Sequence, residues 1–80
     1  MKTYTPSQEM ITRLGNDFTY HAPKEGQPQK YEMIREAGKM LATTIVGVTP
    51  PSREQSLALT AIEEAVFWAN AAVARHEVID

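Results

Sequence analysis

The sequence predicts an all-α protein, in which a short N-terminal helix precedes a long antiparallel helical hairpin and the chains assemble into a homo-oligomer. In two long segments, apolar residues recur at alternating spacings of three and four, the pattern of helices that pack on each other. The second of these segments carries more apolar surface than one neighbouring helix can cover. A chain of 80 residues is too small to bury such a helix, so other copies should cover it.

Composition narrows the class of protein. The chain should form one domain, over residues 1–80, whose core alone supplies about 3–5 kcal/mol. It has no cysteine, so disulfides and thiol nucleophiles are excluded. The net charge of −2, without a basic stripe, argues against binding of long nucleic acid. The N-terminus lacks the apolar run of a signal peptide, and we expect neither a membrane-spanning segment nor a membrane partner.

The first predicted helix covers residues 6–14. Thr5 is expected as its N-cap, with Pro6 at the favoured first position and Gln8 completing a capping box. Gly15 is expected to end it. Such a short helix is not stable alone, so it should dock through Met10, Ile11 and Leu14.

A loop is predicted over residues 15–27 because it contains several turn-forming residues. Tyr20 and His21 lie close to Lys24 in this loop, and aromatic faces beside a cation suit stacked bases and phosphates. The alternative is that Phe18 and Tyr20 cover the bottom of the helical hairpin. Phe18 suits that role better because it has no polar tip.

The second predicted helix covers residues 28–46, and its apolar stripe includes Gly38, which costs about 1 kcal/mol relative to Ala in a helix. That cost is tolerable if another backbone or a ligand approaches closely. Arg35 and Lys39 lie on one face and could grip phosphates. The alternative is an exposed face on which they pair with nearby acids. The stripe consists of Tyr31, Ile34, Gly38, Leu41, Ile45 and Val48.

The third predicted helix covers residues 52–76 and begins with a capping box, in which Ser52 accepts the Gln55 N–H and Gln55 reaches back. The short connection from the second helix makes the two antiparallel neighbours. Near its end, Arg75 suits the helix dipole. The stripe that faces the second helix consists of Leu59, Ile62, Val66, Ala69 and Val73. The stripe left for other subunits consists of Ala58, Ala61, Ala65, Trp68 and Ala72.

The sequence argues against an enzyme. The two histidines, His21 and His76, are far apart in the sequence and lack the spacing of a helical metal pair. Glu63 and Glu64 are adjacent on a helix and so point about 100° apart, which does not form an acid–base dyad. No glycine-rich phosphate loop follows a strand. We therefore expect no catalytic residue, no metal and no cofactor.

Three motifs carry a family resemblance: F-T-Y-H-A-P, S-R-E-x-S-L-A-L-T and W-A-N-A-A-x-A-R. With them, residues 18–75 resemble small phage proteins that sequester cyclic oligonucleotides, the anti-CBASS sponges of the anti-CBASS protein 2 type. The resemblance implies a homohexamer that lowers the free concentration of the messenger without breaking a bond. Cyclic dinucleotides such as 3′,3′-cyclic GMP–AMP would bind between protomers. Cyclic trinucleotides such as cyclic tri-adenylate would bind near the symmetry axis.

The resemblance also implies roles for particular residues. Tyr20 is the first candidate for stacking on a base, and Tyr31 is the second. Arg35 is expected to contact phosphate, with Lys39 as its substitute, and Arg75 matches the trinucleotide site. The implied location is the cytoplasm of the infected bacterial host. A different hypothesis, a helical oligomer that binds a host protein through its apolar faces, predicts that these polar residues are dispensable.

Overall fold

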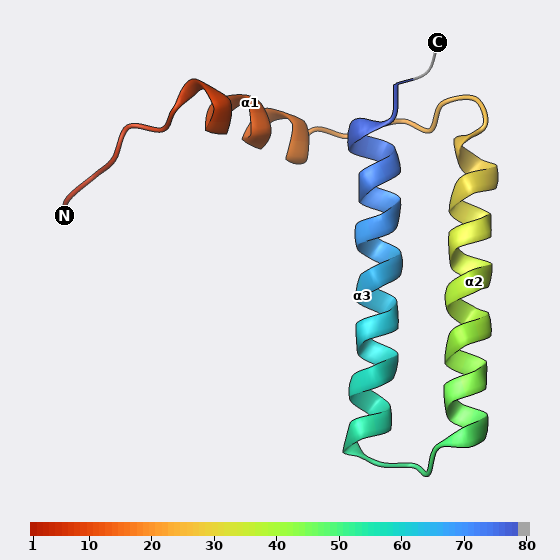
Figure 1. The fold of residues 1–80 in the computed structure, drawn as a ribbon. Helices are drawn as coiled ribbons and strands as arrows, with labels where there is room; N and C mark the ends of the chain where they lie inside the picture. Colours follow the sequence, from red (N-terminus) through yellow and green to blue (C-terminus); the bar gives the residue numbers. More distant parts are fainter. Residues whose placement is uncertain (79–80) are drawn as a thin grey trace.

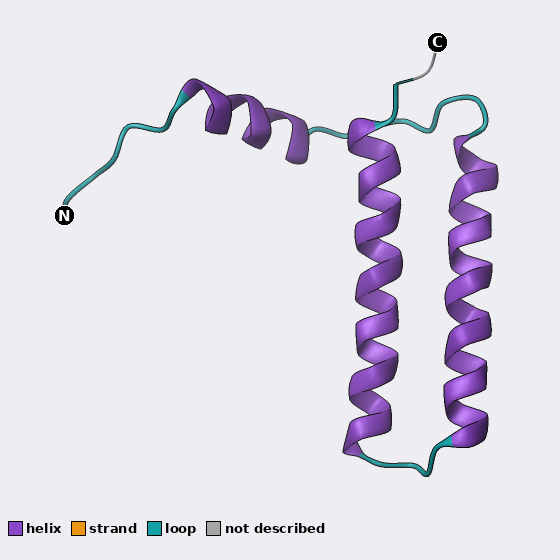
Figure 2. Ribbon diagram, viewed as in Figure 1, coloured by secondary structure: helices purple, strands orange, loops and turns teal. Residues whose placement is uncertain are grey.

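The computed structural model describes residues 1–78, which form three helices and no strand (Figure 2). They are α1 (Gln8–Asp17), α2 (Gln27–Val48) and α3 (Arg53–His76). α2 and α3 run side by side as an antiparallel hairpin, and α1 projects sideways from the end where α2 begins and α3 ends (Figure 1). The predicted helical hairpin is confirmed, and the oligomer stays a prediction.

Both predicted ends of α1 are wrong. The N-cap is Ser7, whose hydroxyl accepts the Met10 N–H at 3.1 Å, so the helix begins after Pro6 instead of at it. Gly15 does not end the helix, because it lies in the helix interior and does not adopt a positive φ. The helix continues to Asp17, and the Phe18 N–H donates to the Leu14 carbonyl at 3.0 Å.

α2 is longer than predicted at both ends. It begins at Gln27, directly after Gly26, whose φ of 84° is the left-handed conformation that glycine adopts most readily. The predicted place of Gln27 in the loop is therefore wrong. At the other end the helix extends to Val48, where the Thr49 N–H donates to the Ile45 carbonyl at 3.0 Å.

At the turn between α2 and α3, one of the two hydrogen bonds of the predicted capping box is present. The Ser52 hydroxyl accepts the Gln55 N–H at 3.1 Å, as expected, and α3 starts one residue later than predicted. The Gln55 side chain does not reach Ser52. Its Nε2 donates to the carbonyl and hydroxyl oxygens of Thr49, at 3.2 and 3.0 Å. Gln55 therefore ties the start of α3 to the end of α2.

The two long helices approach closely at Gly38. A Cβ placed on Gly38 would lie only 2.6 Å from Val66 Cγ2 and 3.7 Å from Ile62 Cγ2. The glycine therefore lets the α2 backbone lie directly under a branched side chain of α3, which is the close approach expected from its place in the apolar stripe. The α3 stripe predicted to face α2 is half-buried there, whereas Trp68 in the neighbouring stripe is exposed.

The single chain has no core. None of the hydrophobic side chains in residues 1–78 is buried. The radius of gyration is 17.4 Å, against about 12 Å for a compact chain of this length. The accessible surface is 6770 Å², against about 4,800 Å² for a folded monomer of this mass. About 2,000 Å² of surface is therefore in excess, as expected for a subunit that needs partners.

α3 contradicts one expectation about membranes. By length and composition alone, this helix of 24 residues is long and apolar enough to cross a membrane. The expectation that no segment meets this criterion is wrong. However, Glu63 and Glu64 lie within the helix, and a charge at the centre of a bilayer costs about 2.5–3.5 kcal/mol. This cost favours an interface between protein subunits as the explanation of the apolar surface.

Candidate functional site

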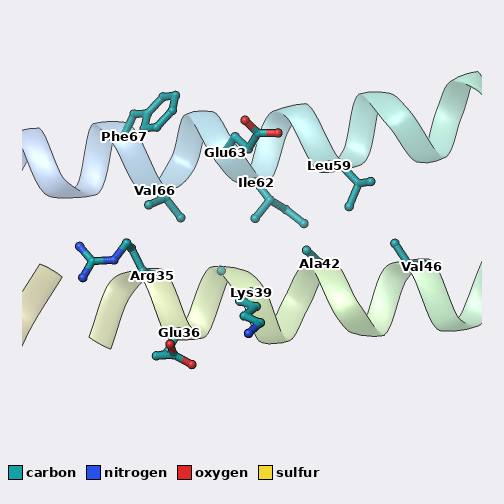
Figure 3. A pocket seen from close by; sticks show the side chains of 11 residues that line it. Arg35, Glu36, Lys39, Ala42, Val46, Leu59, Ile62, Glu63, Val66 and Phe67 are labelled. Carbon is teal, nitrogen blue, oxygen red and sulfur yellow. The ribbon is translucent and has the colours of Figure 1, made fainter. Parts of the chain in front are cut away.

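The middle of the hairpin carries an open groove of about 630 Å³ along one flank of the seam between α2 and α3. This volume lies in the range of about 300–1,000 Å³ typical of small-ligand sites. Figure 3 shows Leu59, Ile62 and Val66 pointing from α3 toward α2, where they form an apolar floor. We call this surface the cation groove, after Arg35 and Lys39, and its lining also includes Glu36, Glu63 and Phe67.

Arg35 and Lys39 lie one helical turn apart on α2 and both line the cation groove. Neither forms a salt bridge with any residue of the described range 1–78. The alternative in which Glu32 and Glu36 neutralise them is therefore wrong for this structure. Two unpaired cations with this spacing are suited to an anionic ligand, since charge-assisted hydrogen bonds to phosphate are strong.

Phe67 is a member of the cation groove that was not among the predicted ligand contacts. It is 65% exposed and rises from α3 at the same end of the groove as Arg35 (Figure 3). An exposed aromatic ring near unpaired cations offers a base-stacking surface. The signal in the sequence is its position outside the stripe that faces α2, which leaves the ring of Phe67 exposed.

Arg75 lies at the open end of the hairpin, which we define as residues 16–30 and 73–77. Its Nη2 donates to the Asp17 carbonyl at 3.3 Å, and its Nη1 lies 3.7 Å from the Asp17 carboxylate. The Asn16 side chain donates to the Arg75 carbonyl at 3.1 Å. These contacts, which we call the Arg75 clamp, attach the end of α1 to the end of α3. They explain why α1 continues past Gly15.

Gln27 organises the rest of the open end and is only 2% exposed. Its Oε1 accepts the Lys24 N–H at 2.9 Å, and its Nε2 donates to the Val73 carbonyl at 3.4 Å and to a Glu77 carboxylate oxygen at 3.2 Å. Lys30 forms a salt bridge with the same carboxylate. These bonds lower the pKa of Glu77 below its ordinary value of 4.5, mainly through the hydrogen bond from Lys30.

The predicted residues of the loop have different surroundings. His21 is half-buried, and its Nε2–H donates to the Asn16 carbonyl at 2.8 Å. Tyr20 is 83% exposed and Phe18 is 85% exposed. The alternative in which both aromatic rings cover the bottom of the hairpin is therefore wrong for the single chain. Both rings are free to contact a ligand or another subunit.

The predicted site residues thus fall into two groups in one chain. Arg35 and Lys39 line the cation groove, whereas Tyr20, His21, Lys24 and Arg75 lie at the open end. Tyr31 is half-buried on α2 between the two groups. The two groups are separated by about 12 Å along α2, because Gln27, at the open end, lies eight positions before Arg35. Within residues 1–78 no group of three acidic or histidine side chains could hold a metal ion.

Comparison with known proteins identifies the fold. A family model described as "Acb2/Tad1, hairpin domain" matches residues 10–74, a range that includes most of α1 and both helices of the hairpin. Neither the comparison with curated proteins nor that with solved structures gives a match. The family consists of sponge proteins, which are binding proteins and not known enzymes. Because the family model covers most of the chain, this protein belongs to the Acb2/Tad1 family of anti-CBASS sponge proteins and carries its hairpin domain.

Proposed function

We propose that this protein sequesters cyclic di- and trinucleotide messengers in pockets between the subunits of a homohexamer. It does not cleave them, and it blocks bacterial CBASS antiphage signalling by lowering their free concentration in the cytoplasm of the infected host. The observation that carries the proposal is the family match over residues 10–74. Tight binding is essential to this mechanism, and a Kd near 1 nM corresponds to about −12.3 kcal/mol.

The cation groove supports binding of a cyclic dinucleotide. Arg35 and Lys39 have no acidic partner among residues 1–78, so their charges are available to the two phosphates of the ligand. The apolar floor and the exposed ring of Phe67 suit the bases. The groove is open on one side, and a second subunit would have to close it. That requirement agrees with the excess surface of the single chain.

Tyr20 would reach such a ligand from a neighbouring subunit. It belongs to the open end of its own hairpin, whereas Arg35 lies about two helical turns along α2. A pocket between subunits could bring Tyr20 of one chain to the Arg35 of another, with His21 and Lys24 beside it. Tyr31, half-buried on α2, is the alternative source of a stacking ring.

Arg75 is the proposed contact of cyclic trinucleotides. Its guanidinium has five N–H donors in all, and the contacts with Asp17 occupy only part of them. The remaining donors could bind phosphate while the clamp stays closed. Copies of Arg75 around a symmetry axis would then present several guanidinium groups to one ligand.

Isothermal titration of the purified protein with 3′,3′-cyclic GMP–AMP and with cyclic tri-adenylate tests the proposal. We expect tight, saturable binding, and intact ligand recovered after heat denaturation of the complex. The absence of binding heat, together with no protection of the messengers from a receptor assay, would show that the proposed function is wrong. Recovery of a cleaved ligand would show an enzyme instead of a sponge.

Two exposed aromatic residues of the connector provide a matched pair of variants. Tyr20→Ala should weaken binding of the dinucleotide by about 5- to 150-fold, since stacking on one base contributes roughly 1–3 kcal/mol. Phe18→Ala removes a ring of equal exposure two residues away and should leave the Kd nearly unchanged. Equal losses in both variants would argue that the connector shapes the pocket without a specific stack on Tyr20.

A further inference from the structure

One side of α1 is apolar, and α1 does not pack along either long helix of its own chain (Figure 1). Met10, Ile11 and Leu14 share this side and are 39%, 49% and 45% exposed. The opposite side is polar and includes Glu9 and Thr12. A helix of ten residues is not stable by itself in water, so the apolar side of α1 requires a partner surface.

The hairpin of the same chain cannot be that partner in this arrangement. The Arg75 clamp holds Asn16 and Asp17 at the end of α3, through contacts of 3.1 and 3.3 Å. From this fixed point α1 runs away from the hairpin (Figure 1). Its apolar side is therefore directed to a second molecule.

The hairpin offers a surface that matches it. On its second flank is a groove of about 440 Å³ whose lining has no charged residue. We call it the alanine groove; it is lined by Ile34, Ala37, Leu41, Ala61, Ala65 and Ala69, among others. Small side chains allow another helix to approach closely. From Ile34 to Leu41 the groove is about 10 Å long, and the apolar side from Met10 to Leu14 spans about 6 Å.

The amount of excess surface favours a second copy of the chain as the occupant. Each chain exposes about 2,000 Å² more than a folded monomer of its mass. A stable interface takes about 800 Å² from each partner, so one chain has enough for two interfaces. Each copy also carries both complementary surfaces, the apolar side of α1 and the alanine groove. A contact between unlike surfaces is heterologous and can close into a ring.

We propose that α1 of each copy docks its apolar side in the alanine groove of a neighbouring copy, and that this contact, repeated around a ring, holds the assembly together. The proposal does not depend on the ligand. A protein that assembles in this way and binds no cyclic nucleotide would overturn the proposed function alone.

Disulfide trapping identifies the contact directly, because the natural chain has no cysteine. Two chains are co-expressed, one with Leu14→Cys and the other, of different mass through a tag, with Ala65→Cys. After mild oxidation we expect a disulfide-linked pair of the two unlike chains on a non-reducing gel. The control replaces Leu14→Cys by Thr12→Cys, on the polar side of the same helix. A yield of unlike pairs no greater than that of the control would overturn the proposal.

The mass of the assembly gives a second, independent test. Ile11→Lys places a charge on the docking side at a position already half-exposed in the single chain, so the hairpin should keep its helical circular dichroism. By light scattering the variant should be smaller than the unmodified protein at equal concentration. Thr12→Lys adds the same charge on the polar side and should keep the full mass. An unchanged mass for Ile11→Lys, or an unmodified protein that is monomeric, would contradict the proposal. Should Ile11→Lys fail to fold, the disulfide experiment decides alone.

Discussion

The cation groove and the open end of the hairpin use their positive charges in opposite ways. At the open end, Arg75 is paired with Asp17 and Lys30 is paired with Glu77. In the cation groove, Arg35 and Lys39 have no such partner within residues 1–78. Arg75 and Lys30 therefore hold parts of the chain together, whereas Arg35 and Lys39 hold nothing in the described part of this chain.

The difference has an energetic meaning. Like charges four residues apart destabilise an exposed helix by about 0.2–0.5 kcal/mol, so Arg35 and Lys39 disfavour α2 slightly. A phosphate bound between them would reverse that effect. The paired cations of the open end need no ligand to be stable. The comparison thus predicts that charge removal in the cation groove affects dinucleotide binding, whereas breaking the Arg75–Asp17 or Lys30–Glu77 pair at the open end affects the position of α1 or the end of α3.

The largest effect is expected from the double variant Arg35→Gln/Lys39→Gln. Each hydrogen bond to a charged group is worth about 1.5–3 kcal/mol, so each of the two substitutions should weaken dinucleotide binding about 10- to 150-fold by isothermal titration. Lys30→Gln removes the same charge from α2 at the open end and should change the Kd by less than about threefold. Comparable losses in both variants would remove the distinction between the two regions.

The next effect concerns the packing beneath the cation groove. Gly38→Ala gains about 1 kcal/mol of helix propensity but places a Cβ 2.6 Å from Val66 Cγ2. Valine is stiff at χ1, and overpacking costs about 1–3 kcal/mol, so after the gain in helix propensity we expect a net loss of stability of up to about 2 kcal/mol in thermal unfolding at fixed protein concentration. Gly47→Ala in the same helix has no atom within 4 Å of the new Cβ and should be neutral or slightly stabilising. If both variants were more stable than the unmodified protein, α2 and α3 would pack less closely at Gly38 than they do in this structure.

A smaller effect is expected from opening the Arg75 clamp. Asp17→Asn removes the ion pairs of Asp17 with Arg75 and with Arg13, and partly exposed pairs are worth about 0–1 kcal/mol each, so hydrogen exchange in α1 should accelerate severalfold. Arg75 keeps its charge in this variant, and the affinity for cyclic tri-adenylate should therefore be preserved. Arg75→Gln leaves the pair between Arg13 and Asp17 in place; it should also accelerate exchange and, in addition, weaken binding of the trinucleotide. Loss of affinity in both variants would mean that Arg75 acts only through the clamp.

The parts of this fold that depend on local chemistry could be predicted from the sequence. The alternating apolar spacing placed both long helices, and Ser52 marked the start of α3 to within one residue. The prediction that α1 ends at Gly15 was wrong because Arg75 supports the continuation of the helix to Asp17. Arg75 is 58 residues from Asp17 in the sequence. Sequence spacing cannot reveal such a long-range contact.

The candidate site was harder to predict for a similar reason. Arg35 and Lys39 could be named from their spacing, but whether Glu32 or Glu36 neutralises them depends on the directions of the side chains in three dimensions. The place of Phe67 in the lining of the cation groove was not predicted, because it depends on the register between α2 and α3. The proposed grouping of Tyr20 with Arg35 requires a neighbouring subunit, and in the single chain the two residues lie in different regions, Tyr20 at the open end and Arg35 in the cation groove.

The smallest effect is the acid dependence of the open end. The pKa of Glu77 is lowered in the folded chain by its bonds with Lys30 and Gln27. Its contribution to stability is therefore present above its ordinary value of 4.5 and is lost as the pH falls through the lowered value. Between about pH 5 and pH 3, Glu77→Gln should lose less thermal stability than the unmodified protein, because the amide side chain of the variant does not titrate. Parallel pH profiles for the two proteins would show that the carboxylate of Glu77 does not hold the end of α3 and that the open end depends on Gln27 and the Arg75 clamp alone.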